Sequence, residues 1–186
     1  KELTGHGVSY CAICDGAFYR NQKILVVGGG DAAVEEAVFL TQFSSQVYLC
    51  HRRDKLQAQA ILQKRLAESP VQVMYSTRLL EIAGEKKVEK VLLQKEGEAP
   101  VWQDFAAVFI FIGTIPNTYF MPKNMALDEN GYILVQGDLA TSVPGIFAAG
   151  DVIQKQLRQV STAVGDGAIA AMSAVKYIQE NFPEMA

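Results

Sequence analysis

A glycine-rich turn between an apolar run and an amphipathic segment constrains the fold of this chain more than any other feature. Residues 23–27 are mostly β-branched or apolar, residues 28–30 are all glycine, and residues 31–43 carry apolar side chains at helical spacing. This order predicts a strand, a tight turn and a helix. A second apolar run at residues 46–50 closes a βαβ unit, which implies a right-handed parallel crossover.

The pattern after this unit predicts an α/β domain with a Rossmann-like three-layer arrangement and an antiparallel β meander. We expect a helix over residues 54–68, because Asp54 and Gln57 have the spacing of a capping box. Short strands are expected at residues 71–75, 78–82 and 88–94, and a fully buried parallel strand at residues 107–112.

The regular pattern of the sequence is broken at Gly113 and Pro116, so we place a domain boundary near these residues. The first domain is expected to span residues 1–118 and the second segment residues 119–186. This second segment holds one short strand near residues 132–135 and a helix of small residues near 162–180. These elements are too few to enclose a core. We therefore expect an incomplete second lobe.

The composition argues against several classes of protein. The formal net charge of the 186 residues is −3, and phosphate binding needs a basic surface, so nucleic acid is not an expected partner. No apolar run is long enough to cross a bilayer, and the first residues lack the apolar core of a signal peptide. Three cysteines fit poorly with a secreted disulfide scaffold. We therefore expect a cytoplasmic protein with no membrane partner.

The glycine turn has the residues of a dinucleotide-binding loop. Gly28 permits the tight turn, Gly30 lets the backbone approach a pyrophosphate, and Ala33 takes the small-residue position between helix and strand. Asp31 and Ala32 open the helix, whose N-terminus offers amide donors and the positive end of its dipole. Glycine turns between strands and helices are common, so a purely structural turn is the alternative.

The end of the second strand indicates which nucleotide the loop would take. His51, Arg52 and Arg53 stand there. An NAD site has an acidic residue near this point for the ribose hydroxyls, whereas an NADP site needs cations for the 2′-phosphate. The sequence therefore predicts NADPH, with a solvated basic turn as the alternative.

Cys11 and Cys14 form a candidate redox pair just upstream of the glycine turn. Cysteines at this spacing can form a reducible disulfide, and Asp15 directly follows as a proton donor and acceptor for the leaving thiolate. Zinc held by these cysteines with Cys50 and His51 is an alternative, but consecutive strand residues point to opposite faces, and we expect no metal. A thioredoxin-like domain is a second alternative, but this Cys-x-x-Cys precedes the first strand instead.

Four stretches together resemble the low-molecular-weight bacterial thioredoxin reductase family. They are residues 7–16 (GVSYCAICDG), 27–37 (VGGGDAAVEEA), 51–54 (HRRD), and 141–152 (TSVPGIFAAGDV) with the following RQV at 158–160 and GDGA at 165–168. The resemblance implies a NADPH-binding domain over residues 1–118 and the C-terminal part of an FAD-binding domain over residues 119–186. It also implies a reaction in which NADPH reduces FAD, FAD reduces the disulfide, and the dithiol reduces thioredoxin or a thioredoxin-like protein after a rotation between the domains.

The resemblance also implies roles for individual residues. Cys14 would face the flavin, Cys11 would attack thioredoxin, and Asp15 would handle protons. Asp151 would hold the ribityl-phosphate region of FAD, and the start of the last helix would stabilise negative charge on the reduced flavin. The further cofactor positions expected are Gly113 near the end of the first domain and, in the second segment, Gly150, Asp151, Arg158, Gln159 and Val160.

The chain also departs from the family. It contains no second GxGxxG loop for FAD, so we expect a fragment of a homodimeric parent that binds NADPH better than FAD and turns over little by itself. Gln57 stands where the family usually carries a further arginine, which weakens the expected preference for NADPH over NADH. The flavoprotein subunit of alkyl hydroperoxide reductase and an NADP-binding module without catalysis are the alternative functions.

Overall fold

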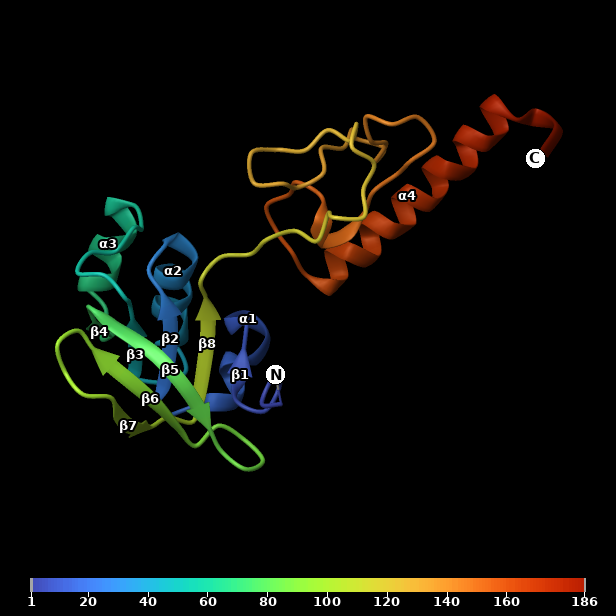
Figure 1. Ribbon diagram of the computed structural model, residues 1–186. Coiled ribbons are helices and arrows are strands. Elements are labelled where there is room, and N and C mark those ends of the chain that lie inside the picture. Colours follow the sequence, from blue (N-terminus) through green and yellow to red (C-terminus); the bar gives the residue numbers. More distant parts are fainter. Residues whose placement is uncertain (1, 186) are drawn as a thin grey trace. The chain divides into compact units, whose positions relative to one another are not determined.

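The chain folds as two compact units. The computed structural model describes residues 2–185, and its backbone divides at Gly113 and Thr114 into unit 1 and unit 2 (Figure 1). The residues just after this division are bonded into unit 2, because Thr114 Oγ1 lies 2.8 Å from the Tyr132 hydroxyl and Thr118 Oγ1 donates to the Gly131 carbonyl. The division therefore falls at the break in the sequence pattern near Gly113, a few residues before the expected end of the first domain at residue 118.

A five-stranded parallel sheet forms the centre of unit 1. Its strands lie in the order β1-β8-β2-β3-β4, and every neighbouring pair is parallel. The strands are β1 (Val8–Ser9), β8 (Ala107–Phe111), β2 (Ile24–Gly28), β3 (Val47–Cys50) and β4 (Gln72–Met74). The α/β class with a parallel sheet is confirmed.

Two helices cover one face of this sheet and contribute to a first hydrophobic cluster. They are α2 (Asp31–Leu40) and α3 (Ala60–Ala67), and Figure 1 shows both on the same side of the strands. Ile24 and Val26 of β2 belong to this cluster together with Ala33 of α2. Successive residues of a strand point to opposite faces of the sheet, so the neighbours of these two residues point to the other face.

An antiparallel sheet covers that other face. It consists of β5 (Thr77–Ala83), β6 (Lys90–Lys95) and β7 (Val101–Asp104), with an irregularity between Leu79 and Glu81. Its buried residues form a second cluster with Leu25 of β2. Helices, parallel sheet and antiparallel sheet are the three layers that the sequence predicted. The sequence had indicated neither β7 nor the two-residue β1, and because β1 lies before Cys11, the expectation that the Cys-x-x-Cys precedes the first strand is wrong.

The prediction of a helix over residues 54–68 is wrong for the first half of that range. α3 begins only at Ala60, and Asp54 caps no helix. The backbone N–H groups of Gln57 and Ala58 donate instead to the carbonyl of Gly29, at 2.7 and 3.1 Å. Bonds to the glycine loop thus take the place of the first helical turns.

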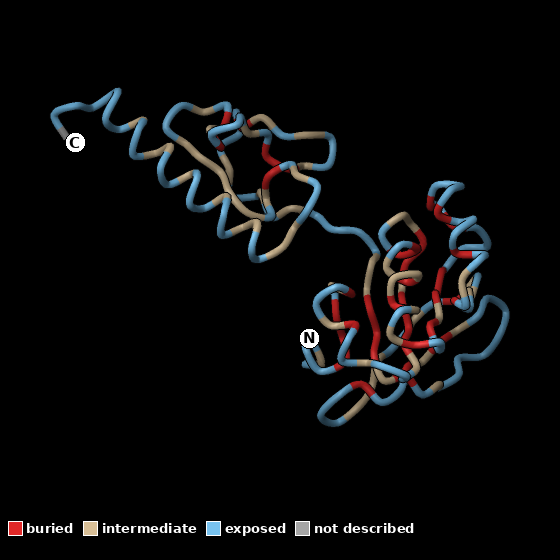
Figure 2. The backbone as a smooth tube through the Cα atoms, turned by 180° about the vertical axis from the view of Figure 1, so that it is seen from behind, coloured by how far each residue is buried: buried red, intermediate tan, exposed pale blue. Residues whose placement is uncertain are grey.

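Unit 2 consists mostly of loops packed against one long helix. The regular elements described are the short 3₁₀ helix η2 (Gly150–Val152), α4 (Val160–Asn181) and a last 3₁₀ turn, η3 (Pro183–Met185). Four buried residues make its small core: Met125, Ile133, Leu139 and Ile153. The strand expected at 132–135 is present only as isolated bridges through Ile133. No residue of α4 is buried, as the pale colours of this helix in Figure 2 show (Figure 2).

Candidate functional site

The glycine loop joins β2 to α2 at the carboxyl end of the central strand. Gly28 pairs with Phe111, and a side chain at Gly28 would collide with the Phe111 carbonyl and with Ala33. A side chain at Gly29 would collide with the His51 ring. Above Gly30, the N-cap of α2, there is open space. The loop therefore needs its first two glycines for packing, and the third leaves the N-terminus of α2 open to a ligand.

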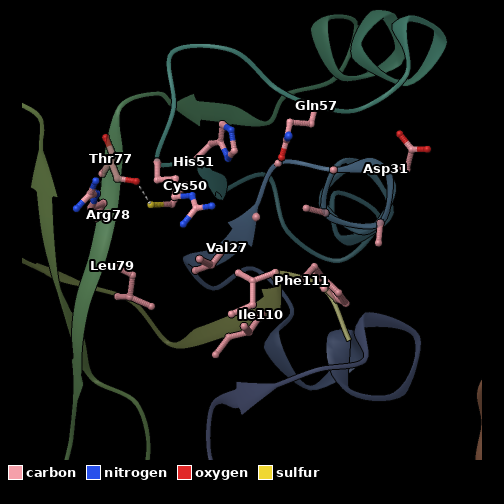
Figure 3. A pocket seen from close by; sticks show the side chains of 18 of the residues that line it. Val27, Asp31, Cys50, His51, Gln57, Thr77, Arg78, Leu79, Ile110 and Phe111 are labelled. Atoms are coloured by element: carbon pink, nitrogen blue, oxygen red, sulfur yellow. Dashed lines mark hydrogen bonds between the residues drawn. The ribbon is translucent and has the colours of Figure 1, made fainter. Parts of the chain in front are cut away.

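A cavity of about 810 Å³ lies beside this loop (Figure 3). It lies at the carboxyl ends of β2, β3 and β8, where the chain passes from one side of β2 to the other. Such a switch point is the usual ligand position in open parallel sheets. The expected positions that line the cavity are Gly28, Gly30, Asp31, Ala32, His51, Arg52 and Gly113.

His51 presents a buried polar atom to this region. The residue is only 6% exposed, and its Nε2 has no hydrogen-bond partner among residues 2–185. Its backbone is fixed, because the N–H donates to Met74 and the carbonyl accepts from Thr77. Figure 3 shows the ring between Gln57 and Cys50. Buried polar atoms in proteins nearly always have a partner, so this nitrogen indicates a polar ligand group.

Three arginines lie around an adjoining cavity of about 590 Å³. Arg52 and Arg53 come from the end of β3, and Arg78 comes from β5. Arg52 and Arg78 line both cavities. None of the ion pairs found between residues 2 and 185 involves these three side chains, although Glu96 lines the same cavity. The positive charge is thus available to an anion.

Sequence reasoning missed Arg78, because only the tertiary structure brings β5 to the end of β3. The N–H of Thr77 donates to the His51 carbonyl at 2.9 Å, and the N–H of Ser76 donates to the Arg53 carbonyl at 3.0 Å. The Cys50 thiol donates to the Thr77 carbonyl at 3.2 Å, as drawn in Figure 3. No local signal in the sequence marks this crossing.

Asp31 holds the segment that precedes α3. Its two carboxylate oxygens accept the backbone N–H and the side-chain Nε2–H of Gln59, both at 2.8 Å. Together with the bonds from Gln57 and Ala58 to Gly29, this contact ties residues 57–59 to the glycine loop. Asp31 therefore fixes the position of residues 57–59 beside the cavity through hydrogen bonds within the protein.

Cys11 and Cys14, the pair expected from the sequence, form a disulfide. Cys11 is the N-cap of α1 (Ala12–Asp15), and its Sγ accepts the N–H of Cys14 at 3.2 Å. The next residue, Asp15, accepts a hydrogen bond from Ser9 at 2.7 Å. The exposed apolar side chains of Tyr10, Ile13 and Phe18 stand close to the disulfide in the chain.

The structure does not bring together the residues that the sequence offered as alternative zinc ligands, which are Cys11, Cys14, Cys50 and His51. Cys50 is buried, and burial raises the pKa of its thiol to about 12, which disfavours the thiolate that a metal would need. Across residues 2–185, no three His, Cys, Asp or Glu side chains gather in a way that could hold a metal ion.

The expected cofactor positions of unit 2 lie around the start of α4. Gly150 has φ of 81°, a left-handed conformation that favours glycine, and its N–H donates to Asp166 Oδ2 at 3.1 Å. Arg158 donates to the Asp151 carbonyl at 3.3 Å. Gln159 is the N-cap of α4, and Val160 is its first residue.

Two charged residues that sequence reasoning missed hold this loop. Lys155 Nζ donates to Asp166 Oδ2 at 2.6 Å and to Thr162 Oγ1 at 3.2 Å. The hydrogen bond from Lys155 lowers the pKa of Asp166, and the N–H of Gly150 acts in the same direction. The loop before α4 is therefore fixed to the first turns of the helix by a charge-assisted contact.

Comparison with known proteins places this chain in a family. Residues 1–167 match the pyridine nucleotide-disulphide oxidoreductases, and the chain belongs to that family. More narrowly, it is similar to thioredoxin reductases. It is 46% identical over 184 residues to the thioredoxin reductase of Listeria innocua serovar 6a, which is 97% of this chain and 57% of that protein.

Comparison with solved structures also shows similarity to thioredoxin reductases. The thioredoxin reductase of Streptococcus pyogenes MGAS5005 matches with a TM-score of 0.90 and 47% identity, over 96% of this chain and 60% of that one. The thioredoxin reductase of Giardia duodenalis matches with a TM-score of 0.82 and 36% identity, over 93% and 58%. The chain thus spans less than two thirds of these relatives. None of the helices described between residues 2 and 185 is long and apolar enough to span a membrane.

Proposed function

We propose that this chain is the nicotinamide and dithiol part of a flavoprotein disulfide reductase that passes electrons from NADPH to the Cys11–Cys14 disulfide and on to thioredoxin or a thioredoxin-like protein. The observation that carries the proposal is the buried, unpartnered Nε2 of His51, which lies beside arginines that make no ion pair between residues 2 and 185. The disulfide lies in the same unit. The similarity to thioredoxin reductases supports the same conclusion.

The residues of the two cavities fit NADPH. The open N-terminus of α2 above Gly30 suits a pyrophosphate, because amide donors and the helix dipole both favour an anion there. Arg52, Arg53 and Arg78 suit a 2′-phosphate, which NADH does not carry. His51 would supply one hydrogen bond between these two anionic groups.

The dithiol chemistry follows from the two cysteines and Asp15. Two electrons open the disulfide, and each sulfur then exists as a thiol or thiolate. Cys11 attacks the disulfide of the partner and forms a mixed disulfide, and Cys14 attacks that bond, which restores the Cys11–Cys14 disulfide and releases a reduced partner. Asp15 would supply and recover the proton of the leaving sulfur. Exposed Ile13, between the cysteines, offers apolar surface to the partner.

FAD fits the residues at the start of α4 in part. Asp151, Arg158 and the N-terminus of α4 would hold it, since these groups lie together on a loop that Asp166 and Lys155 fix. When bound, FAD accepts a hydride from NADPH and supplies electron pairs to the disulfide. For the chain by itself we propose NADPH binding and dithiol exchange with little flavin turnover, because α4 buries none of its residues.

The test is a comparison of NADPH and NADH affinity in this chain by calorimetric titration. We expect NADPH to bind about tenfold tighter or more, as one or two charge-assisted hydrogen bonds imply. Equal affinity would refute the assignment of the arginines. The cytoplasmic location and homodimeric state of the complete protein are proposals drawn from its likeness to bacterial thioredoxin reductases.

A further inference from the structure

Ser9 carries a buried hydroxyl group beside the Cys11–Cys14 disulfide, and sequence reasoning missed it. It ends β1, is 4% exposed, and lies in register with Phe109 of β8. Its Oγ accepts the backbone N–H of Cys11 at 3.1 Å and lies 2.7 Å from Oδ2 of Asp15. One side chain thus connects the central sheet, the backbone of the first cysteine and the carboxyl group that follows the second.

The direction of these hydrogen bonds follows from the chemistry of a hydroxyl. Ser9 has one proton to donate, and the acceptors within reach are Asp15 Oδ2 at 2.7 Å and the Cys11 carbonyl at 3.3 Å. The shorter contact, to a carboxylate, is the stronger one. The lone pairs of Ser9 remain for the N–H of Cys11. Ser9 therefore orients one oxygen of Asp15 and leaves the other to take up a proton.

Tyr19 is a titratable side chain whose pKa responds to the charge of Asp15. Its ring packs edge-on against Phe109, with the ring centroids 6.0 Å apart. Burial, followed by the charge of Asp15, raises the pKa of Tyr19, while its hydroxyl has a backbone partner at Gly7. Tyr19 thus stays a neutral phenol at the pH of the reaction.

We propose that Ser9 is a positioning residue for proton transfer at the dithiol, acting through Asp15. The proposal rests on the role proposed above for Asp15. In the balanced step, one thiol of a reducing dithiol gives its proton to the free oxygen of Asp15 and attacks the Cys11–Cys14 bond, and the sulfur that leaves with the electron pair takes that proton from Asp15. The second thiol of the reductant then gives its proton to Asp15, closes the disulfide of the reductant and releases the other cysteine, which takes the proton and leaves Asp15 as a carboxylate.

Reduction of the chain by dithiothreitol tests this without any cofactor. The rate is followed between pH 6 and 9 by quenching with N-ethylmaleimide and counting adducts by mass spectrometry. We expect Ser9→Ala to be about tenfold slower than the wild type at neutral pH, a part of the 10²- to 10⁴-fold that acid–base catalysis contributes. Ser9→Thr, which keeps a hydroxyl, should retain the rate. Ser9→Ala combined with Asp15→Asn should be no slower than Asp15→Asn alone.

Ser44→Ala is a closely matched control. Ser44 is also buried, accepts an N–H two residues later at 3.1 Å, and donates to the carbonyl of Gln22 at 2.6 Å, yet it lies in the turn before β3. Its loss should lower thermal stability about as much as Ser9→Ala while leaving the reduction rate and its pH profile unchanged. Circular dichroism and urea unfolding, measured on every variant, report whether the chain is folded.

The outcomes separate the two proposals. A Ser9→Ala rate equal to that of Ser44→Ala overturns the role of Ser9, as does a full additive loss in the double variant or an equal loss in folded Ser9→Thr. An Asp15→Asn variant with wild-type rate and pH profile removes the role of Asp15 and that of Ser9 with it. NADPH binding then still decides the nucleotide assignment by itself.

Discussion

Arg78→Met is the most informative perturbation of the proposed NADPH site. Arg78 lies on β5 and, with Arg52, lines both cavities, but it belongs neither to the glycine loop nor to the β3 end. Methionine keeps a long apolar stem, so the variant removes the cation and little of the packing. A loss of NADPH affinity would thus report the charge of Arg78.

The size of the effect follows from the surroundings of the guanidinium. A hydrogen bond to a charged group contributes about 1.5–3 kcal/mol when it is well shielded. Arg78 is exposed, and solvent and salt weaken such contacts. We therefore expect about 1.4 kcal/mol, which is about a tenfold increase in the Kd for NADPH. NADH lacks the 2′-phosphate, so its Kd should change by less than about twofold.

Calorimetric titration of both nucleotides at low and moderate salt measures these changes. The matched control is Lys86→Met, which removes one positive charge from the exposed turn between β5 and β6 of the same sheet. It should leave both affinities near the wild-type values. The reasoning fails if Arg78→Met weakens NADPH and NADH equally, if it weakens neither, or if Lys86→Met has the same effect.

Three further predictions concern the loop, the disulfide and unit 2. Gly29→Ala should destabilise unit 1 by about 1–3 kcal/mol in urea unfolding, because the new methyl group would collide with the His51 ring; unchanged stability would contradict the packing described. The reduced Cys14→Ser variant, mixed with oxidised thioredoxin, should accumulate a mixed disulfide between Cys11 and thioredoxin, because Cys14 is no longer present to break that bond. The Cys11→Ser variant should not accumulate it. The pKa of Asp166 is lower in the folded protein than in the unfolded chain, so its ion pair stabilises unit 2 above the unfolded pKa, and this contribution is lost as the pH falls through the folded value. The protection factors of amides in the loop before α4, which compare the measured exchange rate with the intrinsic rate at the same pH, should therefore fall in acid, and Asp166→Asn should abolish that pH dependence.

Local pattern was enough to predict the elements that carry the chemistry. β2, the glycine loop and α2 follow from an apolar run, three glycines and helical spacing, because strand and helix periodicity are properties of neighbouring residues. The Cys11–Cys14 pair follows from spacing in the same way, since three residues of chain suffice to bring the two sulfurs together.

Long-range hydrogen bonds decided what the sequence could not. The helix expected from residue 54 starts at Ala60, because Gly29 and Asp31 take the backbone donors of residues 57–59. Arg78 joins the other arginines because Thr77 bonds to His51 across 26 residues of chain. The sequence by itself therefore determined which local elements and reactive groups are present. The tertiary structure decided which groups share a site, because that depends on backbone partners far apart in the chain.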